Sequence, residues 1–190
     1  LAESKTKAQA MIMAHQVYID EKLIKKSGEL CLINSKIIIK NNKDKWVSRG
    51  SLKIEPIIID QKIDIKEKIC LDIGSSTGGF TQVLLKHGAK KIYAVDVGYG
   101  QLHEKIAKNS RVLSFERTNA RYLTSKTIKE DLDIIVCDAS FIGFKKVINE
   151  SLNFLKFGGQ VIGLIKPQFE ALKHEVKKNG VIKDKFIHER

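Results

Sequence analysis

The chain has 190 residues, of which 43% are hydrophobic and 29% charged, the proportions of a folded protein with a core rather than of a disordered or fibrous chain. No apolar run approaches the roughly 18 residues that a membrane-spanning helix needs, and no signal peptide is visible. The 34 Lys and Arg against 22 Asp and Glu give a net charge of +12, which favours a polyanionic partner such as RNA, DNA or an anionic lipid surface. A basic surface without such a partner is the alternative.

The three cysteines, Cys31, Cys70 and Cys137, are isolated from one another. Their odd number and their spacing match neither a disulfide framework nor a zinc site. Cys70 and Cys137 lie in apolar runs, where a small buried thiol is ordinary. The cysteines therefore indicate a reducing, cytoplasmic environment and no metal site.

Residues 1–40 predict a small α+β module. Ser4 is expected to cap its helix, because a serine oxygen can accept a backbone N–H of the first turn. Residues 41–48 follow as a linker, since the stretch 40–45 has no apolar residue. In chain order, the expected elements are a helix over residues 5–15, strands over 17–19 and 23–24, and a β-rich piece over 30–39.

Strand and helix patterns alternate from residue 66 onward. Several strands are apolar throughout, which is typical of a parallel sheet covered on both faces. The pattern predicts an α/β domain over residues 49–190, with a Rossmann-like, doubly wound and mostly parallel sheet. The expected strands cover residues 68–72, 91–96, 111–115, 133–138 and 160–166, and the expected helices cover 81–86 and 144–155, the second closed by Phe157-Gly-Gly159.

Three of these strands end in an aspartate: Asp72, Asp96 and Asp138. Ligands of doubly wound sheets bind beyond the carboxyl ends of the strands, so this edge is the expected site. A glycine-rich turn beginning at Gly74 follows the first strand. A dinucleotide fingerprint needs a second glycine two positions later, where Ser76 stands, and a nicotinamide-dependent dehydrogenase is therefore disfavoured.

Six segments in chain order share the pattern of a known family: Trp46-Val-Ser-Arg-Gly-Ser-Leu-Lys53, Leu71-Asp-Ile-Gly-Ser-Ser-Thr-Gly-Gly-Phe80, Ala94-Val-Asp-Val-Gly-Tyr-Gly-Gln-Leu-His103, Glu116-Arg-Thr-Asn-Ala-Arg121, Cys137-Asp-Ala-Ser-Phe141 and Ile165-Lys-Pro-Gln-Phe-Glu170. Together they resemble the TlyA family, also called hemolysins, within the FtsJ-like ribose 2′-O-methyltransferases. The resemblance implies a class I methyltransferase fold and S-adenosylmethionine as cofactor. It also implies that the final strands of the fold would follow Arg190.

The resemblance implies how the cofactor is held. The glycine loop would hold its amino-acid part, and Asp96 would bind the ribose hydroxyls, since a carboxylate can accept two hydrogen bonds. Asn119 would border the adenine and accept from its amino group, with a plain loop role as the alternative. The expected cofactor-binding residues are Asp72, Gly74, Ser76, Gly78, Gly79, Phe80, Asp96, Val97, Asn119 and Ala120.

The resemblance also implies a catalytic set of Lys-Asp-Lys-Glu, whose first three members match Lys53, Asp138 and Lys166. Its glutamate would lie beyond the last residue, so Glu170 is expected only to orient its own loop. A lysine amine becomes available as a base when a cation lies near it. Lys166 is the expected general base or orienting group for a ribose 2′-hydroxyl, with the other two positioning it. Ser51 stands where the family usually has glycine, and a left-handed backbone there would displace Lys53.

The N-terminal module resembles the second helix and strand of the αL RNA-binding motif, whose first helix would precede Leu1. Lys5 and Lys7 lie near the helix start and are expected to contact RNA phosphates, as is Arg49. A small basic cap on the catalytic domain is the alternative.

The expected function is ribose 2′-O-methylation of ribosomal RNA, either naked or in ribosomal subunits. A non-catalytic RNA-binding or ribosome-assembly factor with the same fold is the alternative. A membrane-lytic hemolysin is disfavoured, because the sequence has neither a membrane-spanning run nor a basic amphipathic helix. The nucleotide modified and the oligomeric state are not predicted.

Overall fold

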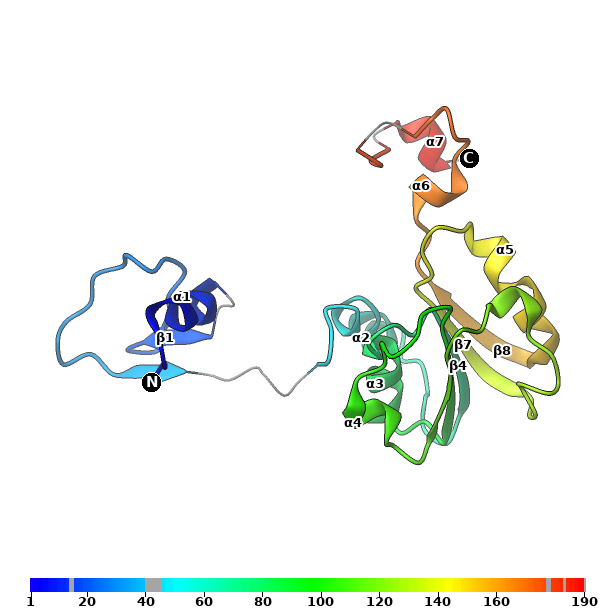
Figure 1. The fold of residues 1–190 in the computed structure, drawn as a ribbon, viewed down its shortest axis with the longest axis horizontal. Helices are drawn as coiled ribbons and strands as arrows, with labels where there is room; N and C mark the ends of the chain where they lie inside the picture. Colours follow the sequence, from blue (N-terminus) through cyan, green and yellow to red (C-terminus); the bar gives the residue numbers. More distant parts are fainter. Residues whose placement is uncertain (14–15, 40–45, 177–178, 183, 190) are drawn as a thin grey trace. The chain divides into compact units, whose positions relative to one another are not determined.

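The computed structural model describes residues 1–13, 16–39, 46–176, 179–182 and 184–189 (Figure 1). The chain forms two compact units, residues 1–45 and 46–190. Most of the expected linker, residues 41–45, lies outside the described residues. Its last three residues belong to the second unit: Trp46 and Val47 pack against that unit's core, and the Val47 N–H donates to Gln82 Oε1 at 2.6 Å.

The first unit holds one helix and a three-stranded antiparallel sheet of order β2-β1-β3. The Lys7 N–H donates to Ser4 Oγ at 3.1 Å, which confirms the predicted cap. The elements are α1 (Lys5–Met13), β1 (Val17–Ile19), β2 (Lys22–Leu23) and β3 (Ile37–Ile39).

The β-rich piece expected over residues 30–39 is confined to its last three residues, so this prediction was wrong for most of its length. Strand β3 pairs only with β1, which is three residues long and ends in a turn with Asp20 and Glu21 at positive φ. The Lys36 N–H closes the ladder on Asp20 Oδ1 at 2.9 Å. With no further length of β1 to pair with, the residues before Lys36 leave the sheet.

The second unit is built on a five-stranded parallel sheet of order β6-β5-β4-β7-β8, which confirms the Rossmann-like prediction. The chain runs outward from β4 through β5 to β6 and then returns to the other side of β4 for β7 and β8. The order of strands thus reverses between β4 and β7, where such sheets bind ligands. The strands are β4 (Ile69–Ile73), β5 (Lys91–Val95), β6 (Val112–Phe115), β7 (Leu132–Cys137) and β8 (Leu155–Gly163).

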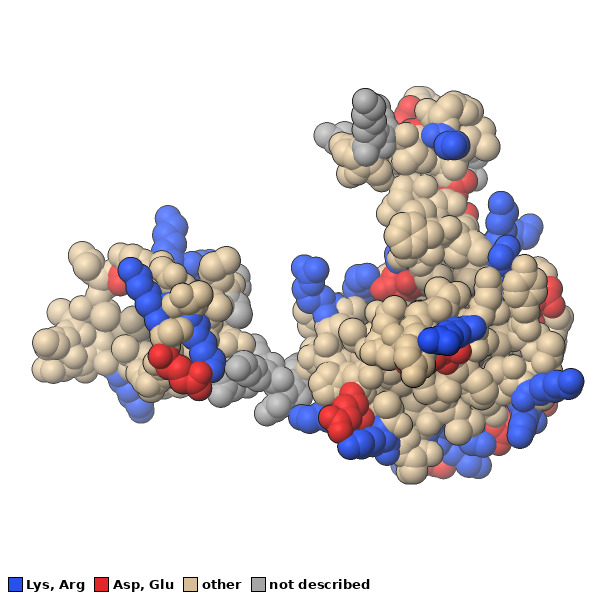
Figure 2. All heavy atoms as spheres, in the orientation of Figure 1, with Lys and Arg blue, Asp and Glu red and all other residues tan. Residues whose placement is uncertain are grey.

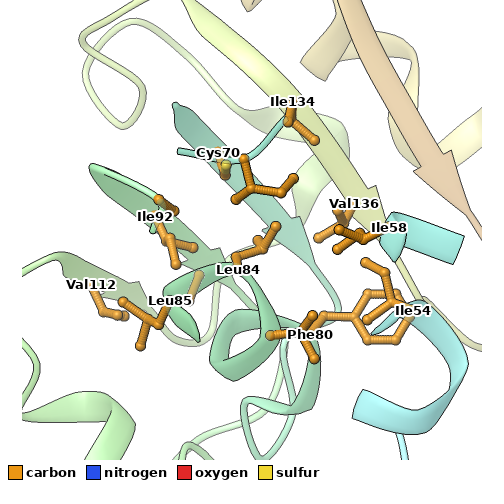
Figure 3. Close-up of a cluster of buried hydrophobic side chains, with 14 of the residues drawn as sticks. Ile54, Ile58, Cys70, Phe80, Leu84, Leu85, Ile92, Val112, Ile134 and Val136 are labelled. Atoms are coloured by element: carbon orange, nitrogen blue, oxygen red, sulfur yellow. The ribbon is translucent and has the colours of Figure 1, made fainter. Parts of the chain in front are cut away.

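Helices cover both faces of this sheet, with α2 and α3 on one side and α5 on the other (Figure 1). The first face is closed by isoleucines of α2 and leucines of α3, packed on the sheet residues Ile92 and Val136 (Figure 3). The helical elements are α2 (Ser51–Asp60), α3 (Gly79–Lys86), α4 (Glu104–Ala107), the 3₁₀ helices η2 (Ala120–Tyr122) and η3 (Asn149–Phe154), α5 (Phe144–Ile148), α6 (Pro167–Glu170) and α7 (Lys185–Glu189).

The helix predicted over residues 144–155 is shorter than expected. It ends as an α-helix at Ile148 and continues as the 3₁₀ helix η3, because Asn149, Ser151 and Asn153 are weak helix formers. Strand β8 then begins at Leu155, so the glycine pair expected to close the helix lies inside the strand. An irregularity accommodates that pair, since Leu132 faces Leu155 while Ile134 faces Gln160.

Candidate active site

The carboxyl ends of β4 and β7 form the floor of the candidate site. Ile73 and Cys137 are register partners, so Gly74 and Asp138 follow side by side. Gly74 has φ +77, and a Cβ there would lie 3.1 Å from the backbone N and Cα of Ala139. Glycine is therefore favoured at position 74, because a side chain there would be strained by the backbone conformation and would crowd the end of the neighbouring strand.

Asp96, which follows β5, is held by two backbone groups. The Ser76 N–H donates to its Oδ2 at 2.8 Å and the Gly98 N–H to its Oδ1 at 2.7 Å. A carboxylate offers about four acceptor positions, so each oxygen keeps one for a ligand. Asp96 is thus a fixed acceptor with capacity for two hydroxyl groups.

Two hollows meet at the strand ends. The first, of about 500 Å³, extends over the ends of β4, β5 and β7. The second, of about 560 Å³, extends toward α2. Both are lined by Gly74, Ser76 and Asp138, so a ligand in each would meet its neighbour beside the Asp138 carboxylate.

Asp138 lies between two lysines. Lys53 Nζ donates to its Oδ2 at 2.8 Å, and Lys166 Nζ lies 2.7 Å from its Oδ1. Lys166 thus forms an ion pair with the Asp138 carboxylate. Its amine donates hydrogen bonds to Ser140 Oγ at 2.8 Å and to the Asp138 carbonyl at 3.2 Å. The Lys53 side chain is 47% exposed and that of Lys166 20%, so Lys166 is the more enclosed amine.

Lys53 reaches the site from the first turn of α2. The buried Ser51 begins that helix and donates its hydroxyl to the Gly79 carbonyl at 2.8 Å, which joins α2 to the start of α3. Ser51 is helical and its φ is not positive, so the left-handed backbone that would have displaced Lys53 is not present. Gly79 admits this approach, because a Cβ there would collide with the Ser48 hydroxyl.

Lys166 reaches the site from the segment that follows β8. The Leu164 N–H donates to the Cys137 carbonyl at 3.0 Å and extends the pairing beyond the strand. Lys166 precedes Pro167 and has the extended backbone that a following proline favours, φ −114 and ψ 100. The extended segment after β8 therefore ends at Lys166, whose amine lies against Asp138.

The FtsJ-like methyltransferase family matches residues 46–190. The chain belongs to this family. Hemolysin A of Brachyspira hyodysenteriae is 41% identical over 193 residues, covering 99% of this chain and 78% of the relative. The 16S/23S rRNA (cytidine-2'-O)-methyltransferase TlyA of Mycobacterium tuberculosis is 37% identical over 191 residues, covering 100% of this chain and 71% of the relative.

A solved structure agrees with these relatives. A candidate hemolysin from Streptococcus thermophilus superposes with a TM-score of 0.74 at 36% identity, covering 98% of this chain and 69% of the other. The resemblance to the TlyA and FtsJ-like proteins is thereby confirmed, as is the class I methyltransferase fold. In the described part of this methyltransferase, no helix is long and apolar enough to cross a bilayer.

Two residues of the expected cofactor set lie behind the hollows rather than along them. Asp72 is fully buried and accepts from Thr81 Oγ1 at 2.6 Å. Burial raises the pKa of its carboxyl to about 7, against the opposing effect of the Thr81 hydrogen bond. Gly78 has φ +91, and a Cβ there would meet Leu102 and Ile106 at 2.9 and 3.2 Å. In this methyltransferase both residues therefore support the glycine loop from its buried side and do not face the hollows.

The other expected cofactor residues lie along the hollows. Val97, Asn119 and Ala120 line the first, while Gly79 and the buried Phe80 line the second. The Asn119 Oδ1 accepts the Arg121 N–H at 3.1 Å and caps η2, which favours the loop role over adenine binding through that oxygen.

The expected RNA-contacting residues divide between the units. Arg49 lines the second hollow together with Lys53. Lys5 and Lys7 lie on α1 of the first unit, where Lys7 pairs with Glu3. On the face of that unit drawn in Figure 2, blue Lys side chains lie beside a smaller red acidic group.

Sequence reasoning missed Ser140, which holds Lys166, and Phe141, which lines the first hollow. Phe141 is 90% exposed and has φ +67, a conformation uncommon for a residue with a side chain. Its ring lies 5.3 Å from that of Phe169. Only the position of Ser140, two residues after a strand-end aspartate, could have indicated a role.

Proposed function

We propose that this chain is an S-adenosylmethionine-dependent methyltransferase that modifies a ribose 2′-oxygen of ribosomal RNA. The observation that carries the proposal is the Lys53–Asp138–Lys166 cluster at the meeting point of the two hollows. The names of two relatives support the substrate: TlyA of Mycobacterium tuberculosis, and a 23S rRNA (cytidine-2'-O)-methyltransferase TlyA of Campylobacter jejuni, 43% identical over 141 residues that make up 73% of this chain and 53% of that relative.

The residues of the first hollow fit the cofactor. Its volume of about 500 Å³ lies within the range of small-molecule sites. Asp96 keeps two acceptor positions for the ribose hydroxyls, and Val97, Asn119 and Ala120 surround the place of the adenine. Gly74 and Ser76, which line both hollows, would hold the amino-acid end, and this end would reach Gly79 and Phe80 where the two hollows meet. When bound, S-adenosylmethionine supplies an electrophilic methyl group on a sulfonium centre.

The second hollow would take the target nucleotide, with its 2′-hydroxyl at the Asp138 end. Lys166 Nζ would orient this hydroxyl or, as the uncharged amine, take its proton as the oxygen–carbon bond forms and the methyl–sulfur bond of the cofactor breaks. Asp138 fixes Lys166 and Lys53 on its two oxygens, so both amines are held in place before the substrate binds. Arg49, in the same hollow, would bind a phosphate of the RNA.

We assign residues 1–40 to an αL-type RNA-binding module and residues 46–190 to the methyltransferase domain. Lys5 and Lys7 stand at the start of α1, where free backbone N–H groups also favour phosphate. Unit 1 would hold rRNA or a ribosomal subunit while unit 2 acts on it. A ribosomal substrate locates the enzyme in the cytoplasm.

The test is methyl transfer from labelled S-adenosylmethionine to rRNA and to ribosomal subunits. Label should appear on a ribose 2′-oxygen. Lys166→Ala and Asp138→Ala should each abolish its transfer, and Lys166→Ala should do so without weakening cofactor binding. Lys156→Ala is the matched control, because Lys156 pairs with Asp133 at 3.0 Å at the opposite end of the strands. Cofactor and RNA binding without any transfer would favour the ribosome-assembly factor instead.

A further inference from the structure

Two segments that border the active site are joined by three contacts. One segment connects β7 to α5 and carries Ser140, and the other follows β8 and carries Lys166. Lys166 Nζ donates to Ser140 Oγ at 2.8 Å, and the Phe141 and Phe169 rings lie 5.3 Å apart. The third contact is farthest from the Asp138 cluster: the Phe144 N–H donates to Glu170 Oε1 at 2.5 Å.

The third contact replaces a helix cap. The residue before α5 is Gly143, which has no side chain to accept the free N–H groups of the first turn. Glu170 supplies that acceptor from 26 positions away. A Cβ at Gly143 would lie 2.8 Å from Glu170 Oε2, so glycine leaves the room that the carboxylate occupies.

Glu170 can make this contact because Pro167 begins a single helical turn directly after Lys166. Glu170 is the last residue of this turn, so its carboxylate follows the Lys166 amine by the length of α6. Lys166 holds the near part of the β7–α5 segment at Ser140, and Glu170 holds its far part at Phe144. Phe141, between these two points, keeps φ +67. Such a conformation persists only where the surrounding structure holds it in place.

We propose that Glu170 is a positioning residue of the methyl-transfer reaction. By fixing the β7–α5 segment, it keeps Ser140 against Lys166 and thereby keeps the Lys166 amine on Asp138. This inference rests on the proposed function. Glu170 acts through backbone groups of Gly143 and Phe144, outside the two hollows, so it differs from the family glutamate of the catalytic set.

The kinetic test compares Glu170→Ala with Glu170→Gln, whose amide oxygen can still accept the Phe144 N–H. A misplacement of this kind costs about tenfold to hundredfold in rate, so kcat should fall by that factor in the alanine variant. The KM for S-adenosylmethionine should stay at its wild-type value, and the glutamine variant should recover most of kcat. Glu175→Ala is the matched control, because Glu175 accepts a backbone N–H of Leu172 within the same C-terminal segment.

Gly143→Ala breaks the same contact from the other side. Gly143 has φ −66, which alanine adopts freely, so the new Cβ acts by displacing the Glu170 carboxylate. This variant should lose kcat as Glu170→Ala does, and the double variant should lose no more than either single one. Hydrogen exchange of the Phe144 amide gives a readout that does not depend on catalysis. Exchange should accelerate in Glu170→Ala and Gly143→Ala and should stay slow in Glu170→Gln and Glu175→Ala.

The outcomes separate this inference from the proposed function. An unchanged kcat with a rapidly exchanging Phe144 amide would overturn the positioning role, as would losses of kcat and cofactor affinity in equal proportion. An unchanged exchange rate in Glu170→Ala would overturn the contact itself. A wild-type protein that transfers no methyl group to RNA would refute the proposed function and the positioning role with it, while the exchange rates would still decide whether Glu170 caps α5.

Discussion

Lys53 and Asp138 are 85 positions apart in the sequence, and Lys53 Nζ donates to Asp138 Oδ2 at 2.8 Å. Helix α2 brings the lysine to this place by packing Ile54 and Ile58 into the core that α3 shares. Lys166 approaches the other carboxylate oxygen from the end of β8. Three elements of the fold thus converge on one carboxylate, and the three side chains should behave as a unit.

The first prediction concerns this unity. Lys53→Ala and Lys166→Ala should each lower kcat by about 10²–10⁴-fold, the usual range for a positioned acid–base group. The effects of residues that act as a unit are strongly non-additive, so kcat of the double variant should be no lower than that of the less active single variant. Single-turnover rates on rRNA with saturating cofactor measure this. Losses that multiply would show that the two amines act independently.

The second prediction concerns Asp96. Loss of two hydrogen bonds to a charged acceptor costs about 3 kcal/mol, so Asp96→Ala should raise the Kd for S-adenosylmethionine by roughly a hundredfold. Part of the loss comes from the freed N–H groups of Ser76 and Gly98. Isothermal titration calorimetry measures the affinity. Glu104→Ala is the control, because this exposed carboxylate pairs with Lys108 four residues along the chain. Equal effects in the two variants would contradict the assignment of Asp96.

The edge that carries the site was predictable because its signals are local. An apolar strand that ends in aspartate can be recognised from its own residues, and β4, β5 and β7 were predicted in this way. Helix α2 was missed, since Pro56 in its interior argues against a helix and removes one of its N–H donors. Packing stabilises the helix despite the proline, because Ile54 and Ile58, four residues apart, bury one face of it against the sheet.

The contacts of Lys166 illustrate what sequence reasoning leaves out. Lys166 itself was predicted from the resemblance to the TlyA family. Its partner Ser140 lies 26 positions away, and a side-chain hydrogen bond over that distance produces no periodic pattern in the sequence. The Glu170 cap of α5 is hidden in the same way, because a glycine N-cap does not indicate which distant residue replaces it.

The third prediction concerns pH. The Asp72 carboxyl has a pKa of about 7 in the folded protein because of burial, against an ordinary value of about 3.9 in an unfolded chain. Between these values the folded state binds the extra proton, so the free energy of unfolding should decrease as pH rises from 4 to 7. Asp72→Asn lacks this contribution. Urea unfolding at pH 5 and pH 8 should therefore show a smaller loss of stability for the variant, and equal losses would contradict a raised pKa.

The fourth prediction uses two glycines that share a conformation but differ in surroundings. Gly74 and Gly100 have φ +77 and +64, so alanine at either position costs roughly 1–2 kcal/mol of backbone strain. A Cβ at Gly100 meets nothing within 4 Å, whereas one at Gly74 lies 3.1 Å from the backbone of Ala139. Backbone atoms cannot swing aside, so Gly74→Ala must also push the ends of β4 and β7 apart and displace Asp138.

We therefore expect Gly100→Ala to lower the free energy of unfolding by about 1 kcal/mol and to leave kcat at its wild-type value. Gly74→Ala should cost about 2–4 kcal/mol, since overpacking adds to the strain, and should lower both cofactor affinity and kcat. Urea unfolding and calorimetric titration of the two variants side by side measure the difference. If both variants lost the same stability and kept the same kcat, the close approach of Gly74 to Ala139 would have no part in holding the site together.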